Sequence, residues 1–171
     1  MYCYGRFITF ALFLFFLPVS ASCDEPAYRV RIESGGIVPF HINSMRKYND
    51  GQVLAEWTIL SFHIENYPEA IEWEVELSTS ENLFQGDYGN TLPTEGLIVK
   101  AHEIIPSDPG LFFPQFTDLG STPQTLVQGT GNGTFFITVT YELGTQEDHT
   151  LLGENPDYYF SELYYVLKII N

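Results

Sequence analysis

The chain has 171 residues and carries 22 Asp and Glu residues against seven Lys and Arg residues, which gives a formal net charge of −15. A nucleic-acid partner is therefore not expected, because phosphate backbones are bound by clustered basic side chains and the only adjacent basic pair is Arg46-Lys47. The length suits one domain that buries a core without disulfides.

Residues 1–22 are expected to be a secretory signal peptide. Arg6 precedes an apolar run from Phe7 to Leu17, and Pro18 and several small residues follow it. The run is shorter than the roughly 20 residues that span a bilayer, and no later segment is apolar enough to do so. We therefore expect an exported protein in which residues 23–171 form a single domain.

Two processing routes are compatible with the end of this leader. Val19-Ser20-Ala21 has the small-residue pattern of a general signal peptidase site, whereas Ser20-Ala21-Ser22-Cys23 resembles the lipobox of bacterial lipoproteins, with Ser20 where that pattern has Leu. Cys3 leaves with the leader in either case, so Cys23 would be the sole cysteine of the mature protein, and an unpaired exported thiol is a liability. Lipidation of Cys23 would anchor the domain to a membrane surface without inserting it.

Alternation of apolar and polar residues predicts extended structure along the rest of the chain, with no segment of helical periodicity. Turn signals rich in Gly, Pro and Asn separate the candidate strands, for example Asn49-Asp50-Gly51. The predicted strands cover residues 28–33, 37–42, 54–66, 71–77, 83–84, 97–105, 125–128, 134–143 and 163–170.

The segment IEWEVEL at residues 71–77 alternates strictly, with Glu72, Glu74 and Glu76 on one face and Trp73 among the apolar residues on the other. A catalytic carboxyl group needs a raised pKa from burial or from a cleft, and a row of glutamates along a strand face offers neither. We therefore interpret the glutamates as the solvated face and the tryptophan as core.

These strands favour an all-β fold, an antiparallel immunoglobulin-like β-sandwich with about seven to nine strands. Within GNGTFFITVTYEL, the positions Gly133, Phe135, Ile137 and Val139 resemble the penultimate strand of bacterial immunoglobulin-like and PKD-like modules. Trp73 would then take the place of the buried tryptophan of an early central strand. The paired core cysteines of antibody domains are absent, and the resemblance implies a fold and no function.

No motif for catalysis or for cofactor binding is present in the sequence. There is no Gly-x-Ser-x-Gly nucleophile motif, and His41, His63, His102 and His149 lack the spacing of zinc ligands. No cofactor is therefore expected. The acidic loop at residues 147–157 offers oxygen ligands for calcium, but a solvated loop is the preferred interpretation and the alternative stays open.

Two aromatic clusters are the candidate binding residues. Phe112, Phe113 and Phe116 lie in a proline-rich segment where polar residues are usual, and Tyr158 and Tyr159 follow the acidic loop. Exposed aromatic side chains suit both sugars and protein partners. The alternative is that the phenylalanines fold back to cap one end of the sandwich.

The resulting functional hypothesis is a non-enzymatic, exported binding or adhesion module that recognises a protein or glycan through its loops and touches a membrane only through a lipid on Cys23. One alternative is a cell-envelope glycan hydrolase that uses Glu72, Glu74 or Glu103. A second alternative is an accessory subunit of an envelope assembly, whose C-terminal strand Leu163–Ile170 pairs with a neighbouring chain. The sequence fixes no oligomeric state.

Overall fold

The structure is a computed structural model and describes residues 25–68, 71–104, 111–114 and 119–170. Its regular secondary structure is almost entirely β. The elements in chain order are β1 (Ala27–Ser34), β2 (Phe40–Ile42), α1 (Met45–Asp50), β3 (Gln52–Glu65), β4 (Glu72–Thr79), β5 (Leu83–Gly86), β6 (Thr91–Pro93), β7 (Ile98–Glu103), β8 (Gln124–Thr130), β9 (Gly133–Leu143), β10 (Asp157–Phe160) and β11 (Leu163–Ile170).

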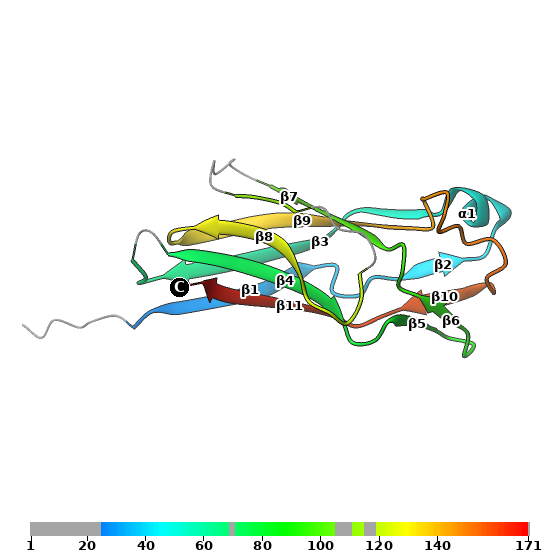
Figure 1. The fold of residues 1–171 in the computed structure, drawn as a ribbon, viewed down its shortest axis with the longest axis horizontal. Helices are drawn as coiled ribbons and strands as arrows, with labels where there is room; N and C mark the ends of the chain where they lie inside the picture. Colours follow the sequence, from blue (N-terminus) through cyan, green and yellow to red (C-terminus); the bar gives the residue numbers. More distant parts are fainter. Residues whose placement is uncertain (1–24, 69–70, 105–110, 115–118, 171) are drawn as a thin grey trace, which may run out of the picture.

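The strands form three antiparallel sheets. Sheet A has the order β1-β3-β9-β7, sheet B the order β2-β10-β5-β6, and sheet C the order β11-β4-β8. Sheets A and C lie over one another as two layers, and sheet B forms the opposite end of the elongated molecule together with α1 (Figure 1). Strand β1 begins and strand β11 ends at the end of the molecule away from sheet B (Figure 1).

The core between sheets A and C is built from the apolar alternates of their long strands. Trp73 of β4 is fully buried and lies edge-on against Phe62 of β3, with ring centroids 5.0 Å apart, and 4.9 Å from the ring of Phe135 of β9. The Trp73 Nε1–H donates to the carbonyl of Gly131 at 3.1 Å. The expected burial of the IEWEVEL apolar face and of the central β9 residues is confirmed.

Tyrosines join the two layers in one place. The hydroxyl groups of Tyr141 on β9 and Tyr165 on β11 are hydrogen-bonded to each other, and the Tyr141 hydroxyl also donates to Thr58 Oγ1 at 2.9 Å. Burial is the largest influence on both groups, raising the pKa of Tyr141 to about 12 and that of Tyr165 well above its ordinary value. Both hydroxyls therefore stay neutral in the folded protein at ordinary pH.

Strand β3 contains a bulge opposite β9. Three β3 residues stand opposite one β9 residue between Leu54 and Thr58, and Glu56 takes a φ of +48° there. The bulge is held by a hydrogen bond from the backbone N–H of Glu56 to Thr140 Oγ1 at 2.8 Å. A Cβ on Gly35 would lie 2.1 Å from the carbonyl oxygen of Trp57, so only glycine fits beside the bulge.

The described residues form eleven strands, more than the seven to nine expected from the sequence. The two additional strands are β6 and β10 of sheet B, which comprise three and four residues and carry too few alternations to be recognised. Helix α1 was also not expected. It has six residues and begins after Ser44, whose side chain accepts a hydrogen bond from the N–H of Lys47.

Candidate functional site

The two predicted aromatic clusters lie on different sheets and do not form one site. Phe112 pairs with Gln128 of β8 in sheet C, whereas Tyr158 belongs to β10 in sheet B at the opposite end of the molecule (Figure 1). Phe116 and Cys23 lie outside the described residues.

The first cluster divides between surface and core. The ring of Phe112 is 61% exposed, and its backbone exchanges two hydrogen bonds of 2.9 Å with Gln128, so this segment runs along the edge of β8. Phe112 also borders a shallow pocket of about 240 Å³ that includes Ile170. Phe113 is half-buried and packs against the core.

The second cluster is split by the alternation of β10. Tyr159 is fully buried, with its hydroxyl donating to the carbonyl of Asn155 at 2.7 Å, so the expectation that it is a surface binding residue is wrong. Its neighbours Tyr158 and Phe160 are 46% and 44% exposed, because successive residues of a strand point to opposite faces of the sheet.

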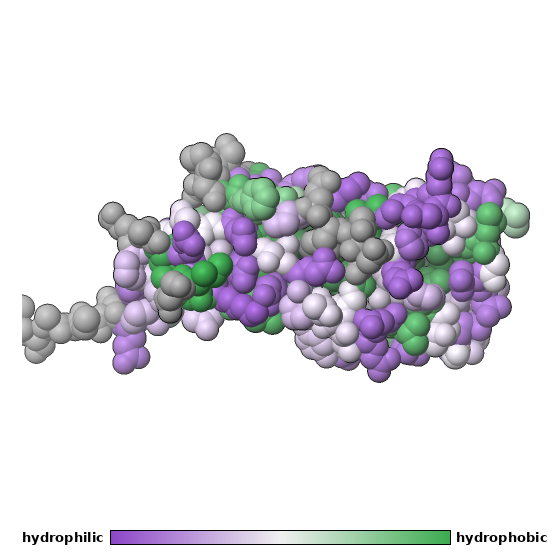
Figure 2. All heavy atoms as spheres, viewed as in Figure 1, coloured by the Kyte–Doolittle hydropathy of each residue, from purple (hydrophilic) through white to green (hydrophobic). Residues whose placement is uncertain are grey.

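The outward side chains of sheet B make up what we call the distal aromatic face, defined as His41, Leu83, Tyr158 and Phe160. His41 of β2 stands opposite Tyr158, and the two rings stack with centroids 3.5 Å apart and planes 12° from parallel. Leu83 of β5 is 39% exposed, and Tyr88 in the adjoining turn is 83% exposed. On the face of the molecule shown in Figure 2, apolar side chains emerge in several groups among polar ones.

A pocket of about 310 Å³ adjoins Phe160 on this face. Its polar groups are acceptors and donors suited to hydroxyl groups: the Gln85 amide donates to Glu81 at 3.2 Å, and Glu162 accepts from the Tyr164 hydroxyl at 2.8 Å. The lining consists of Ser80, Glu81, Leu83, Gln85, Phe160, Ser161 and Glu162.

The buried carboxylate of Asp157 fixes the turn beside the distal aromatic face. It accepts hydrogen bonds from Asn90 Nδ2 at 2.9 Å and from the backbone N–H groups of Tyr88 and Tyr158 at 3.1 and 2.7 Å. Burial opposes its ionisation, but these hydrogen bonds outweigh burial and lower the pKa of Asp157 below its usual 3.8. A Cβ on Gly86 would lie 2.2 Å from Asp157 Oδ2, so a glycine is required there.

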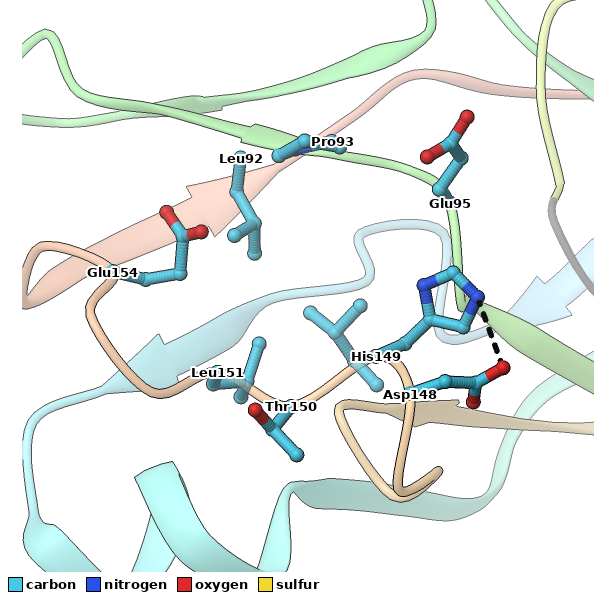
Figure 3. A pocket seen from close by; sticks show the side chains of 9 residues that line it. Leu92, Pro93, Glu95, Asp148, His149, Thr150, Leu151 and Glu154 are labelled. Atoms are coloured by element: carbon cyan, nitrogen blue, oxygen red, sulfur yellow. Dashed lines mark ion pairs between the residues drawn. The ribbon is translucent and has the colours of Figure 1, made fainter.

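The acidic loop forms a second, smaller pocket of about 160 Å³ (Figure 3). Glu95 and the Asp148–His149 pair, whose Oδ2 and Nε2 atoms are 3.9 Å apart, lie on one side, and Glu154 lies on the other. Asp157 is turned toward Asn90 instead. No group of three or more His, Cys, Asp or Glu side chains that could hold a metal ion occurs in the described part of the chain.

The glutamates of β4 lie on the outer face of sheet C, where the sequence placed them. Glu76 pairs with Lys168 of β11 at 2.5 Å, and Glu74 accepts from Thr125 Oγ1 of β8 at 3.0 Å. Glu103 stands on β7 in the other large sheet, so the carboxylates named for a hydrolase are not brought together.

Comparison of the chain with protein-family models and with curated proteins found no match to either. The fold and the surface therefore define only a class, an all-β protein of three antiparallel sheets with an aromatic outer face on its smallest sheet. Among the residues that the structure describes, no helix is long and apolar enough to cross a membrane.

Sequence reasoning identified Tyr158 but missed the partners that make it part of a surface. Leu83 and His41 come from strands far away in the sequence, and each is a single residue in a short segment. The alternation of Tyr158, Tyr159 and Phe160 was a usable signal that the first and third rings share a face. No local signal identifies which other strands complete it.

Proposed function

We propose that this protein is an exported, non-enzymatic binding module of the immunoglobulin-like kind that recognises a glycan through the distal aromatic face. The observation that carries the proposal is the exposure of Tyr158 and Phe160 on one face of sheet B beside a polar pocket. Exposed aromatic groups gathered on one face mark ligand or partner contacts more often than scattered ones do.

The chemistry of the face favours a carbohydrate over a protein. A flat ring packs against the C–H groups of a sugar, and the stacked His41 holds the Tyr158 ring in one orientation before a ligand arrives. Glu81, Glu162 and the Gln85 amide would exchange hydrogen bonds with sugar hydroxyls at the edge of Phe160. A protein partner would need a larger apolar area than these few side chains supply.

The position of the face also suits an exported and anchored protein. Strand β1 begins at Ala27, four residues after Cys23, so a lipid on Cys23 would lie within about 14 Å of the start of the strand. The distal aromatic face is at the other end of the molecule (Figure 1). An anchor at Cys23 would therefore direct this face away from the membrane.

The test is a glycan-binding screen of the mature protein, followed by titration of any bound glycan against variants. Tyr158→Ala and Phe160→Ala should each weaken binding at least tenfold, which corresponds to about 1.4 kcal/mol, and leave the melting temperature nearly unchanged. Phe136→Ala is the matched control, because Phe136 is 41% exposed on sheet A. Equal binding by wild type and both sheet B variants would refute the proposal, as would an equal loss with Phe136→Ala.

A further inference from the structure

The two large sheets leave one side of the sandwich open. Strand β1 is the edge of sheet A and strand β11 is the edge of sheet C, and they run along the same side of the molecule (Figure 1). Between them lies a groove of about 410 Å³. Its lining is mainly apolar and consists of Val30, Arg31, Ile32, Leu163, Tyr164 and Tyr165.

Strand β1 carries core-type residues that its neighbours cover only in part: Val30 packs against the core, and the Tyr28 ring lies 6.4 Å from the Tyr67 ring. Ile32 stands opposite Leu60 of β3 and Tyr28 opposite Ile64, so the members of each pair point to the same side of sheet A. The β3 residues are at most 1% exposed, whereas Tyr28 and Ile32 are 50% and 43% exposed. One more strand beside β1 would place its inward side chains over this uncovered surface.

Two of the other edges differ from β1. The edge of β8 is bridged by Phe112, and the inward residue Leu167 of β11 is only 5% exposed, although Tyr164 and Val166 on the outer face of β11 are 48% and 45% exposed. Natural edge strands are usually blocked by proline, by inward-pointing charges or by short length. Strand β1 has eight residues, no proline and no charge on its inward face. Its free backbone groups are a template for pairing at a spacing of about 4.8 Å.

The charges of β1 indicate which kind of strand would fit. Arg29, Arg31 and Glu33 occupy its outward positions, which leaves one net positive charge on this face; the Arg31 side chain is 74% exposed, with its Nε 3.7 Å from Glu33 Oε2. The β11–β4 pair of this protein shows the matching arrangement, in which Lys168 on the outward face contacts Glu76 at 2.5 Å while Leu167 stands opposite Val75. A strand beside β1 would gain by carrying acidic residues outward and apolar residues inward.

We propose that β1 accepts, by strand addition, an extended segment of a partner protein in which apolar residues alternate with acidic ones. This site is separate from the distal aromatic face and does not depend on its function. A second copy pairing through its own β1 is disfavoured as the occupant, because Arg29 and Arg31 of the two strands would then lie side by side on one face. The chain's own apolar and acidic strand, β4, is already paired on both edges.

The test uses fluorescently labelled peptides of the same length as β1 and fluorescence anisotropy with the mature protein. The probe alternates Val and Glu; one control alternates Val and Lys, and another has the Val and Glu residues grouped in two blocks. The Val-Glu probe should bind at least tenfold more tightly than both controls. Its binding should also protect β1 amides from hydrogen exchange.

Variants locate the site. Arg31→Glu should weaken the Val-Glu probe at least tenfold and strengthen the Val-Lys peptide, and Ile32→Lys should abolish binding by placing a charge on the inward face. Arg46→Glu is the matched control, because the Arg46 side chain is 90% exposed on α1. Melting temperatures verify that each variant is folded.

Three results would overturn the inference. The first is no binding of the Val-Glu probe, and the second is equal binding of the Val-Glu and Val-Lys peptides. The third is a concentration-dependent dimer that Ile32→Lys dissociates, which would make a second copy the occupant instead of an acidic partner strand.

Discussion

Replacement of Trp73 by Ala is the most direct test of how the two large sheets are held together. Trp73 is fully buried and contacts Phe62 and Phe135 across the layers, so its removal leaves a cavity in the centre of the sandwich. It also removes the indole hydrogen bond to the carbonyl of Gly131. We expect a large loss of stability without a change of fold.

The magnitude follows from burial. A buried tryptophan side chain removes roughly 200 Å² from water, which at about 25 cal/mol per Å² corresponds to an upper value near 5 kcal/mol. Measured Trp→Ala losses in cores are about 3 to 5 kcal/mol. An expected loss of about 4 kcal/mol is a large share of the 5 to 15 kcal/mol that usually stabilises a domain.

The assay is urea unfolding of both proteins followed by far-ultraviolet circular dichroism, which does not depend on the removed fluorophore. Trp57→Ala is the matched control, because Trp57 is 40% exposed and makes one hydrogen bond, from Nε1 to the carbonyl of Ile37 at 2.7 Å. It should cost about 1 kcal/mol. A Trp73→Ala loss no larger than the Trp57→Ala loss would refute the assignment of Trp73 to the centre of the core.

Other predictions concern edges and ionisable groups. Phe112→Ser should change the unfolding free energy by less than about 0.5 kcal/mol, whereas the half-buried Phe113→Ser should lower it by at least about 1 kcal/mol in the same urea assay. Because burial raises the pKa of Tyr141 to about 12, the stability that its neutral hydroxyl contributes should be fully present below pH 10 and lost between pH 10 and 12. In thermal melts, Tyr141→Phe should therefore lose less stability than wild type over this range. Because the pKa of Asp157 is lowered below 3.8, its contribution should be present above that pH and lost below it. Melts of Asp157→Asn should therefore change less with acid than melts of wild type, and an identical acid response would contradict this assignment.

The sequence alone was sufficient for the long strands. The alternation around Trp73 in β4 and around Ile137 in β9 predicted both the strands and the residues that are buried. It also placed Glu74 and Glu76 on the outer face, where the structure has them. This succeeded because the two-residue period of a strand is a local property that needs no knowledge of neighbours.

Alternation sorts side chains into two faces, but it does not say what covers each face. Tyr28 and Ile32 have the pattern of core residues and remain exposed because β1 is an edge. Tyr159 lies in the core because its face of β10 is turned inward, which the sequence did not indicate. Coverage depends on which strands become neighbours, and that is decided by pairing across the whole chain.

The sequence by itself determined an all-β chain, the inward and outward residues of its longest strands and the excess of negative charge. Only the tertiary structure decided that a third sheet exists, that Tyr158 and His41 meet on it, and that β1 lies along an open side. The physical reason is that these features join segments distant in the sequence. Their formation depends on packing free energies that no single segment encodes.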